Sequence, residues 1–145
     1  MKKRLILLAA LPLVLLLAGC MAGANAKDAG KYSMNASVAY GAAEDGSLDK
    51  TTVTYQIFVG GAKEDVENIA SQEILINADY VDILRESGPH QARMNYGDQP
   101  YLEMSGAFVF DTQGKSKEEI DAMGLLRGVS VVDKDQNAYV LEFQK

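Results

Sequence analysis

Three groups of residues in this sequence have types and spacings that could support chemistry. The first is Cys20, the only cysteine among the 145 residues, whose thiol could be modified. The second is His90, the only histidine, which could act as a base toward the nearby Ser87. The third is the acidic run that begins at Asp133, whose oxygen atoms could bind a cation. These counts exclude an intramolecular disulfide, a zinc site built on cysteines and any site with several histidines.

Cys20 ends a segment that is typical of a secretory signal. The basic residues Lys2, Lys3 and Arg4 precede an almost wholly apolar run at residues 5–18, and a glycine stands just before the cysteine. The apolar run is shorter than the roughly 20 residues that a membrane-spanning helix needs. We therefore predict a signal peptide at residues 1–19.

Leu17-Ala18-Gly19-Cys20 resembles the lipobox of bacterial lipoproteins. The resemblance implies that the Cys20 thiol receives a diacylglycerol, that cleavage occurs just before it, and that the mature chain begins there. Met21, the next residue, would allow the outer membrane in a Gram-negative organism. In a Gram-positive organism the anchor would lie on the outer face of the cell membrane. The alternative is an ordinary signal peptide that is cut near Ala24 or Ala26.

The mature chain would be strongly acidic. The whole sequence has a formal net charge of −6, and loss of the three basic residues before Cys20 leaves −9. Such a charge argues against nucleic acid as a partner and would hold the body away from an anionic bilayer. Residues 20–31 are small, polar-leaning and aperiodic, which predicts a flexible tether from the lipidated Cys20. Residues 32–145 then form one domain.

The segment around His90 combines basic and aromatic residues in an acidic chain. Gly88-Pro89 and Gly97-Asp98 are strong breakers, and they predict a loop over residues 85–99. Arg and Tyr are enriched in binding hot spots, and long loops often carry recognition. We predict a partner-binding loop with the following residues: Arg85, His90, Arg93, Tyr96 and Tyr101. An ordinary solvated loop is the alternative.

The acidic run resembles the opening of an EF-hand calcium loop, with Asp133, Asp135 and Asn137 at alternate positions. That loop requires glycine at its sixth position and glutamate at its twelfth, where this chain has Ala138 and Gln144. The flanking segments also alternate like strands. We therefore favour a solvated hairpin turn and keep a calcium site as the weaker alternative.

Enzymatic signatures are missing from the sequence. No Gly-x-Ser-x-Gly elbow surrounds Ser87, as a serine hydrolase of that type would need. Carboxylate pairs such as Glu44 with Asp45 lie in predicted turns, and the chain has no tryptophan to form a sugar platform. We therefore expect no enzymatic activity and no cofactor.

The elements that must position these residues are short strands. Apolar and polar side chains alternate, which is typical of half-buried strands, in these segments: 32–40, 51–59, 72–78, 101–110, 129–132 and 138–143. Asp45-Gly46 predicts a hairpin turn between the first two strands. Gly106 falls on the apolar face of its strand, where it could admit a neighbouring aromatic ring.

Two segments depart from this alternation. After Ala78 the apolar residues change parity, which predicts a bulge near Asp79-Tyr80 or a short helix over residues 79–86. Ser116 and Glu119 have the spacing of a capping box, which predicts one short helix near 116–126.

Many short strands with one minor helix predict an antiparallel β-sandwich of immunoglobulin-like or similar Greek-key type. A lipocalin-like barrel fits less well, because eight longer strands would strain this length. For function we expect an envelope lipoprotein whose domain binds a protein partner or supports an envelope complex. The alternatives are a small-ligand or calcium module and an inhibitor of a secreted enzyme, with a hydrolase last.

Overall fold

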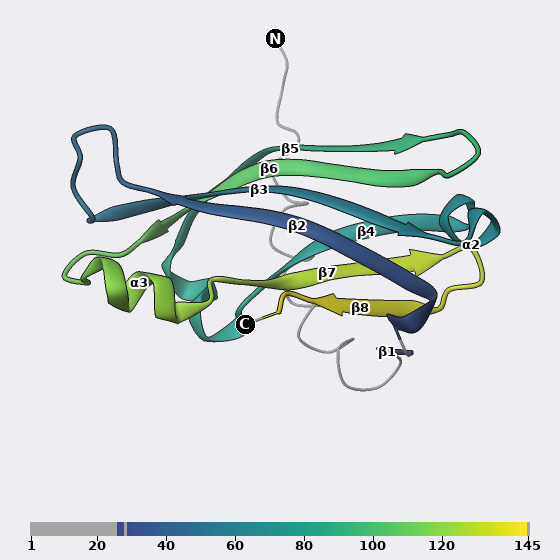
Figure 1. Cartoon of the computed structure of the whole chain (residues 1–145). Helices are drawn as coiled ribbons and strands as arrows, with labels where there is room; N and C mark the ends of the chain where they lie inside the picture. Colours follow the sequence, from purple (N-terminus) through teal and green to yellow (C-terminus); the bar gives the residue numbers. More distant parts are fainter. Residues whose placement is uncertain (1–25, 28, 145) are drawn as a thin grey trace, which may run out of the picture.

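The computed structural model describes residues 26–27 and 29–144, which form two β-sheets packed face to face (Figure 1). The strands in these residues are β1 (Ala26–Lys27), β2 (Tyr32–Gly41), β3 (Lys50–Gly61), β4 (Ile69–Ile76), β5 (Leu84–Asn95), β6 (Tyr101–Asp111), β7 (Leu126–Asp133) and β8 (Ala138–Glu142). The helical segments are η1 (Ala29–Lys31), α2 (Lys63–Glu67), η2 (Ala78–Ile83) and α3 (Lys117–Met123). The predicted β-sandwich is confirmed.

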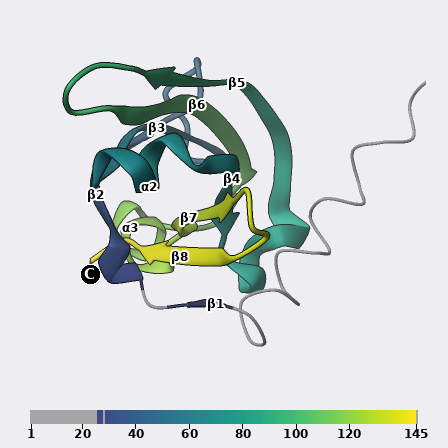
Figure 2. The ribbon, with the colours of Figure 1, turned by 90° about the vertical axis from the view of Figure 1, so that its right-hand side faces the viewer.

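The strand order is that of an immunoglobulin constant-type sandwich. One sheet has the order β2-β3-β6-β5 and the other has β4-β7-β8, with the two-residue β1 added in parallel beside β8. Counted along the chain from β2, these are the four-strand and three-strand sheets of the seven-strand immunoglobulin domain. In the view turned by 90°, β3 and β6 lie above β7 and β8 as separate layers (Figure 2). Strands β4 and β5 are each the last strand of their sheet.

Inward-facing side chains of the central strands form the core, as their alternation predicts. These core residues are Val53, Tyr55, Ile57, Val59, Leu102, Met104, Phe108 and Phe110 from one sheet, and Val129, Val131, Tyr139 and Leu141 from the other. Burial of one such side chain stabilises the fold by roughly 1.5–3 kcal/mol. The two sheets are therefore held together mainly by apolar contact.

Strand β2 pairs with β3 as the predicted hairpin, in a register that runs from Tyr32 opposite Gly61 to Gly41 opposite Thr52. Its apolar face is less buried than the alternation predicts. Tyr32 is buried, whereas Ala36 and Tyr40 are exposed. The reason is that β2 is an edge strand. It has a neighbouring strand on one side only, so its side chains lack neighbours on the other side.

The apolar residues change parity after Ala78 because the chain has left the strand there. The pairing of β4 with β7 slips between Leu75 and Ile76, and the chain then enters the 3₁₀-helix η2. The short-helix alternative is therefore nearer to the structure than a simple bulge. The Asn77 side chain accepts a hydrogen bond from the Asp79 N–H and donates to the carbonyls of Met123 and Gly124, so it joins η2 to the end of α3.

Helix α3 begins with the predicted capping box and lies at one end of the sandwich (Figure 1). The Ser116 hydroxyl accepts from the Glu119 N–H at 3.2 Å, and the Glu119 carboxylate accepts from the Ser116 N–H at 2.7 Å. The helix ends at Gly124, whose φ of 59° is the left-handed conformation that glycine adopts without a steric penalty. Ile120 and Met123 face the core.

Of the predicted tether (20–31), the structure describes residues 26–27 and 29–31, and these lie against the domain. Ala26 and Lys27 pair with β8. The Lys31 ammonium is 3.2 Å from an Asp65 carboxylate oxygen and lies over the Tyr139 ring. A charged side chain therefore fastens the chain where it enters β2.

Candidate functional site

The prediction of a loop over residues 85–99 is wrong for most of that segment. Strand β5 runs through Asn95, and the turn to β6 occupies only the residues between them. Gly88-Pro89, which has a cis peptide bond, lies inside β5. An edge strand tolerates a proline because its outer side has no partner strand that needs an N–H, and a bulge accommodates the extra residue. These breakers interrupt the strand locally without ending it.

The five residues of the predicted binding loop do not share one surface. His90 lies opposite Gly106, on the face of β5 that lines the cavity, and is exposed there. Arg85 donates to the Asp111 carboxylate and to the Asp82 carbonyl. Arg93 pairs with Glu103, and Tyr101 packs edge-on against Phe58. Tyr96 lies in the turn and is 76% exposed.

His90 belongs to a row of residues that crosses three neighbouring strands. Gly106 of β6 is paired with Tyr55 of β3 on one side and with His90 of β5 on the other. A Cβ at Gly106 would lie 2.4 Å from His90 Nδ1 and 2.7 Å from the Tyr55 hydroxyl. The glycine is what allows these two side chains to meet above it, which agrees with the prediction that Gly106 admits a ring.

A bulge in β5 brings a serine to the same face. Ser87 is opposite Phe108 and His90 is opposite Gly106, so three steps along β5 match two along β6. In a regular strand, residues three apart would point to opposite faces. The extra residue at Gly88-Pro89 therefore turns both Ser87 and His90 inward.

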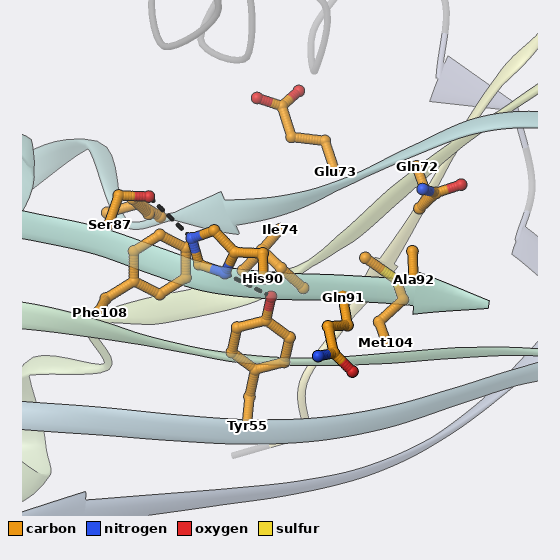
Figure 3. Close-up of a pocket in the computed structure, with 11 residues that line it drawn as sticks. Tyr55, Gln72, Glu73, Ile74, Ser87, His90, Gln91, Ala92, Met104 and Phe108 are labelled. Carbon is orange, nitrogen blue, oxygen red and sulfur yellow. Dashed lines mark hydrogen bonds between the residues drawn. The ribbon is translucent and has the colours of Figure 1, made fainter. Parts of the chain in front are cut away.

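These side chains form a continuous hydrogen-bonded chain (Figure 3). The Tyr55 hydroxyl is 2.8 Å from His90 Nδ1, and the Ser87 hydroxyl is 2.8 Å from His90 Nε2. The His90 ring also packs against the Phe108 ring, with centroids 4.6 Å apart. We name Tyr55, His90 and Ser87 the relay.

Both titratable groups of the relay are uncharged near neutral pH. Burial raises the pKa of Tyr55 to about 12, so the phenol keeps its proton. Partial burial lowers the pKa of His90, so the imidazole stays neutral. A neutral imidazole donates from one ring nitrogen and accepts at the other, which gives the relay a direction.

The relay lines a cavity of about 450 Å³ between the two edge strands β4 and β5. Its apolar wall consists of Ile74, Ile76, Ala92, Met104 and Phe108, and its other polar residues are Gln72, Glu73 and Gln91. Burial raises the pKa of Glu73, whose carboxylate points away from His90 (Figure 3). The arrangement is a mainly apolar hollow with one hydrogen-bonded polar cluster in its wall.

Sequence reasoning did not identify this cavity. Its β4 wall and its β5 wall belong to different sheets, and no local pattern reports that they face each other. Two signals in the sequence pointed toward the site. One is Gly106 on an apolar face, and the other is the three-residue spacing of Ser87 and His90, which puts both on one face of a strand only when a bulge lies between them.

The weak calcium candidate is a closed hairpin. The Asp133 carboxylate accepts from the N–H groups of Asp135 and Asn137, each at 2.9 Å, from the Asn137 side chain, and from the Tyr139 hydroxyl. Asp133 is 1% exposed, so the expectation of a solvated turn is wrong at this residue. The hairpin's own donors occupy both carboxylate oxygens. Within the described residues, no group of three or more Asp, Glu, His or Cys side chains could hold a metal ion.

The predicted signal peptide (1–19) and the lipobox-like residues 17–20, with Cys20, lie outside the described residues. In the part of the chain that the structure does describe, no helix is long and apolar enough to cross a membrane.

Comparison with known proteins adds no relative: no family model, no curated protein and no solved structure matches this chain.

Proposed function

We propose that this protein is a lipid-anchored, non-enzymatic binding protein of the bacterial envelope that holds a small ligand between β4 and β5. One observation carries the binding role: a cavity of about 450 Å³ that opens between the edge strands of two sheets. Ligand sites are usually hollows of about 300–1,000 Å³ with apolar walls and a few placed polar groups. The relay and the five apolar wall residues match that description.

The anchor rests on Leu17-Ala18-Gly19-Cys20. A diacylglycerol on Cys20, with a further acyl chain, would hold the chain firmly at a membrane surface. The outer membrane is the proposed location in a Gram-negative organism, and the outer face of the cell membrane in a Gram-positive one. Mass spectrometry of the N-terminal peptide of the membrane-extracted protein should find a lipidated Cys20. Cys20→Ser should release the chain from membranes, and an unmodified Cys20 would reject the anchor.

The cavity can be tested with a neutral apolar dye, N-phenylnaphthylamine, whose fluorescence rises in apolar surroundings. The protein is the mature chain from residue 20 with Cys20→Ser, so that no lipid competes. We expect saturable binding that is lost in Ala92→Trp, because Ala92 lies in the cavity wall opposite Met104 and is exposed there. Ala39→Trp is the matched control, because Ala39 is exposed on β2 at the other edge of the sheet. Absence of saturable binding, or equal binding by Ala92→Trp, would reject the proposal.

A second candidate function is the docking of a protein partner at the β5–β6 turn. It is favoured by the exposure of Tyr96, and by Arg93, whose side chain is 72% exposed although it pairs with Glu103. Exposed Tyr and Arg are the residue types of binding hot spots. A photocrosslinking residue at Tyr96 should give one discrete adduct in intact cells, weakened by Arg93→Ala. The same crosslinker at Asn35, exposed on β2, should give none. Identical adduct patterns from both positions would reject this candidate.

A further inference from the structure

The relay can run in two directions, and the two have different chemical consequences. In the inward direction, Ser87 donates to His90 Nε2, and Nδ1–H donates to the Tyr55 oxygen. In the outward direction, the Tyr55 hydroxyl donates to Nδ1, and Nε2–H donates to the Ser87 oxygen. The heavy-atom distances of 2.8 Å at both links permit either. Each direction leaves one hydroxyl hydrogen without a partner inside the relay: that of Tyr55 in the inward direction and that of Ser87 in the outward direction. The favoured direction is the one in which this hydrogen can find an acceptor.

Burial selects the outward direction. Tyr55 is 3% exposed, and its hydroxyl lies above Gly106 in the space shared with His90. Among the described residues, His90 Nδ1 is the one hydrogen-bond partner of this hydroxyl, so in the inward direction its hydrogen would lose that partner. An unsatisfied buried donor costs about 1–3 kcal/mol. In the outward direction the free hydrogen belongs to Ser87, which is exposed at the cavity and can reach water or a ligand.

We infer that the relay runs outward and ends in the Ser87 hydroxyl, which donates to an oxygen acceptor of an uncharged apolar ligand, such as a ketone, ester or amide carbonyl. This inference rests on the proposed function of the cavity. Each donor in the relay is then used, and each link polarises the next. The geometry provides one directed donor beside an apolar wall.

The charges around the cavity favour a neutral ligand. Among the described residues that line it, none is Lys or Arg, so a carboxylate or phosphate ligand would find no cation. The mature chain has a net charge of −9, which repels anions further. Glu73 is the one acidic residue in that lining, and because its carboxylate points away from the relay it would not pair with a cation bound beside Ser87 (Figure 3).

The shape of β5 favours a small molecule over an added peptide strand. Its pairing with β6 is irregular between Leu84 and Glu86 and again between Ser87 and His90, and Pro89 lies in the second irregularity. Bulges and prolines are features that prevent edge strands from accepting another strand. The cavity, rather than the free edge of β5, is therefore the surface offered for binding.

The outward direction also removes the strongest argument for a hydrolase. A base must take the Ser87 proton, and Nε2 cannot take it while Nε2 carries a hydrogen of its own. Ser87 then binds a carbonyl as a donor and does not attack it.

The test compares two neutral dyes on the Cys20→Ser mature chain: prodan, which carries a ketone oxygen, and N-phenylnaphthylamine, which has no carbonyl. Ser87→Ala should weaken prodan binding about fivefold, since one neutral hydrogen bond is lost, and should weaken N-phenylnaphthylamine binding less. Tyr55→Phe should also weaken prodan binding, because without the Tyr55 hydroxyl the His90 hydrogen is no longer fixed on Nε2. Ser87→Thr keeps the hydroxyl and should retain most of the affinity.

The outcomes separate the two levels of the proposal. If both dyes bind but Ser87→Ala weakens neither or weakens both equally, the directed donor is wrong and the cavity stands. If neither dye binds, the cavity proposal fails, and the donor proposal fails with it. Ser87-dependent hydrolysis of p-nitrophenyl butyrate would show that the relay runs inward and would overturn the inference.

Discussion

Two hydrogen-bonded clusters in this sandwich, one centred on Asp133 and one on His90, differ in how far they are enclosed. In the β7–β8 hairpin, Asp133 is buried and its carboxylate accepts from Asp135, Asn137 and Tyr139. In the relay, the hydrogen bonds run from a buried tyrosine to the exposed Ser87 at a cavity. In the first cluster the partners of the carboxylate, which include the Lys31 ammonium at 3.9 Å, all belong to the domain, whereas the second cluster ends in an exposed hydroxyl at a cavity.

The difference shows how a small β-domain separates stability from recognition. In a closed cluster the central group bonds only to other groups of the fold, so removing the Asp133 carboxylate leaves its donors without their acceptor. An open cluster can lose its outermost member at little cost, because water replaces it. Substitutions and acid should therefore affect the two clusters to different extents.

Asp133→Ala should give the largest loss of stability. The N–H groups of Asp135 and Asn137 would lose their acceptor, and we expect the melting temperature to fall by about 10 °C. Asp133→Asn keeps the shape of the side chain and one acceptor oxygen. Its melting temperature should therefore lie between those of wild type and Asp133→Ala. Thermal unfolding followed by circular dichroism measures both. Ser87→Ala is the matched variant in the open cluster and should change the melting temperature little. Equal changes in the two clusters would break the comparison.

Acid should weaken the closed cluster next. Burial acts to raise the pKa of Asp133, but hydrogen bonds from Asn137, Asp135 and Tyr139 outweigh it, so the pKa is lowered. A carboxyl with a lowered folded pKa contributes its full stability above its unfolded pKa of about 3.9 and loses it as the pH falls through the folded pKa. Wild type should therefore lose stability below about pH 4 more steeply than Asp133→Asn. The measurement is the midpoint of urea unfolding as a function of pH for both proteins. Parallel curves would contradict the prediction.

Gly106→Ala should destabilise the fold by about 2 kcal/mol, because overpacking forces neighbouring atoms apart. The added Cβ would meet His90, the Tyr55 hydroxyl and the backbone oxygen of Pro89, all within 2.7 Å. Urea denaturation measures the loss. Gly97→Ala is the control, because nothing lies within 4 Å of its Cβ position. An unchanged free energy of unfolding in Gly106→Ala would mean that Tyr55 and His90 do not meet above this residue.

Tyr55→Phe should have the smallest effect on stability, about 1 kcal/mol, because one neutral hydrogen bond is lost. Nitrogen NMR of His90 sharpens the result. Wild type should carry its hydrogen on Nε2, and Tyr55→Phe should show both tautomers. Tyr96→Phe, at an exposed residue, should change neither quantity. A hydrogen on Nδ1 in wild type would reverse the direction of the relay.

Much of the fold could be predicted from local pattern. Alternation in β3 and β6 predicts which residues are buried, and Ser116 with Glu119 predicts where α3 begins. These signals work because the side-chain period of a strand and the caps of a helix are local properties of the chain. The segment after Gly88-Pro89 was wrongly predicted as a loop, since whether a proline interrupts a strand depends on whether that strand lies at a sheet edge.

The candidate site could be predicted only in fragments. Ser87 and His90 are close in sequence, but the bulge that turns both inward is a matter of pairing with β6. Tyr55 has the alternation of an ordinary core residue, and its contact with His90 joins residues 35 positions apart. The β4 wall comes from the opposite sheet altogether.

The sequence by itself determined the alternating strands, the capped helix, the acidic balance and the lipobox-like segment, because each depends on neighbouring residues or on composition. Only the tertiary structure decided which polar groups are closed and which are open. Asp133 and His90 both lie in short polar stretches of sequence. One is enclosed by its own hairpin and the other opens on a cavity, because the packing of two sheets determines what covers each side chain.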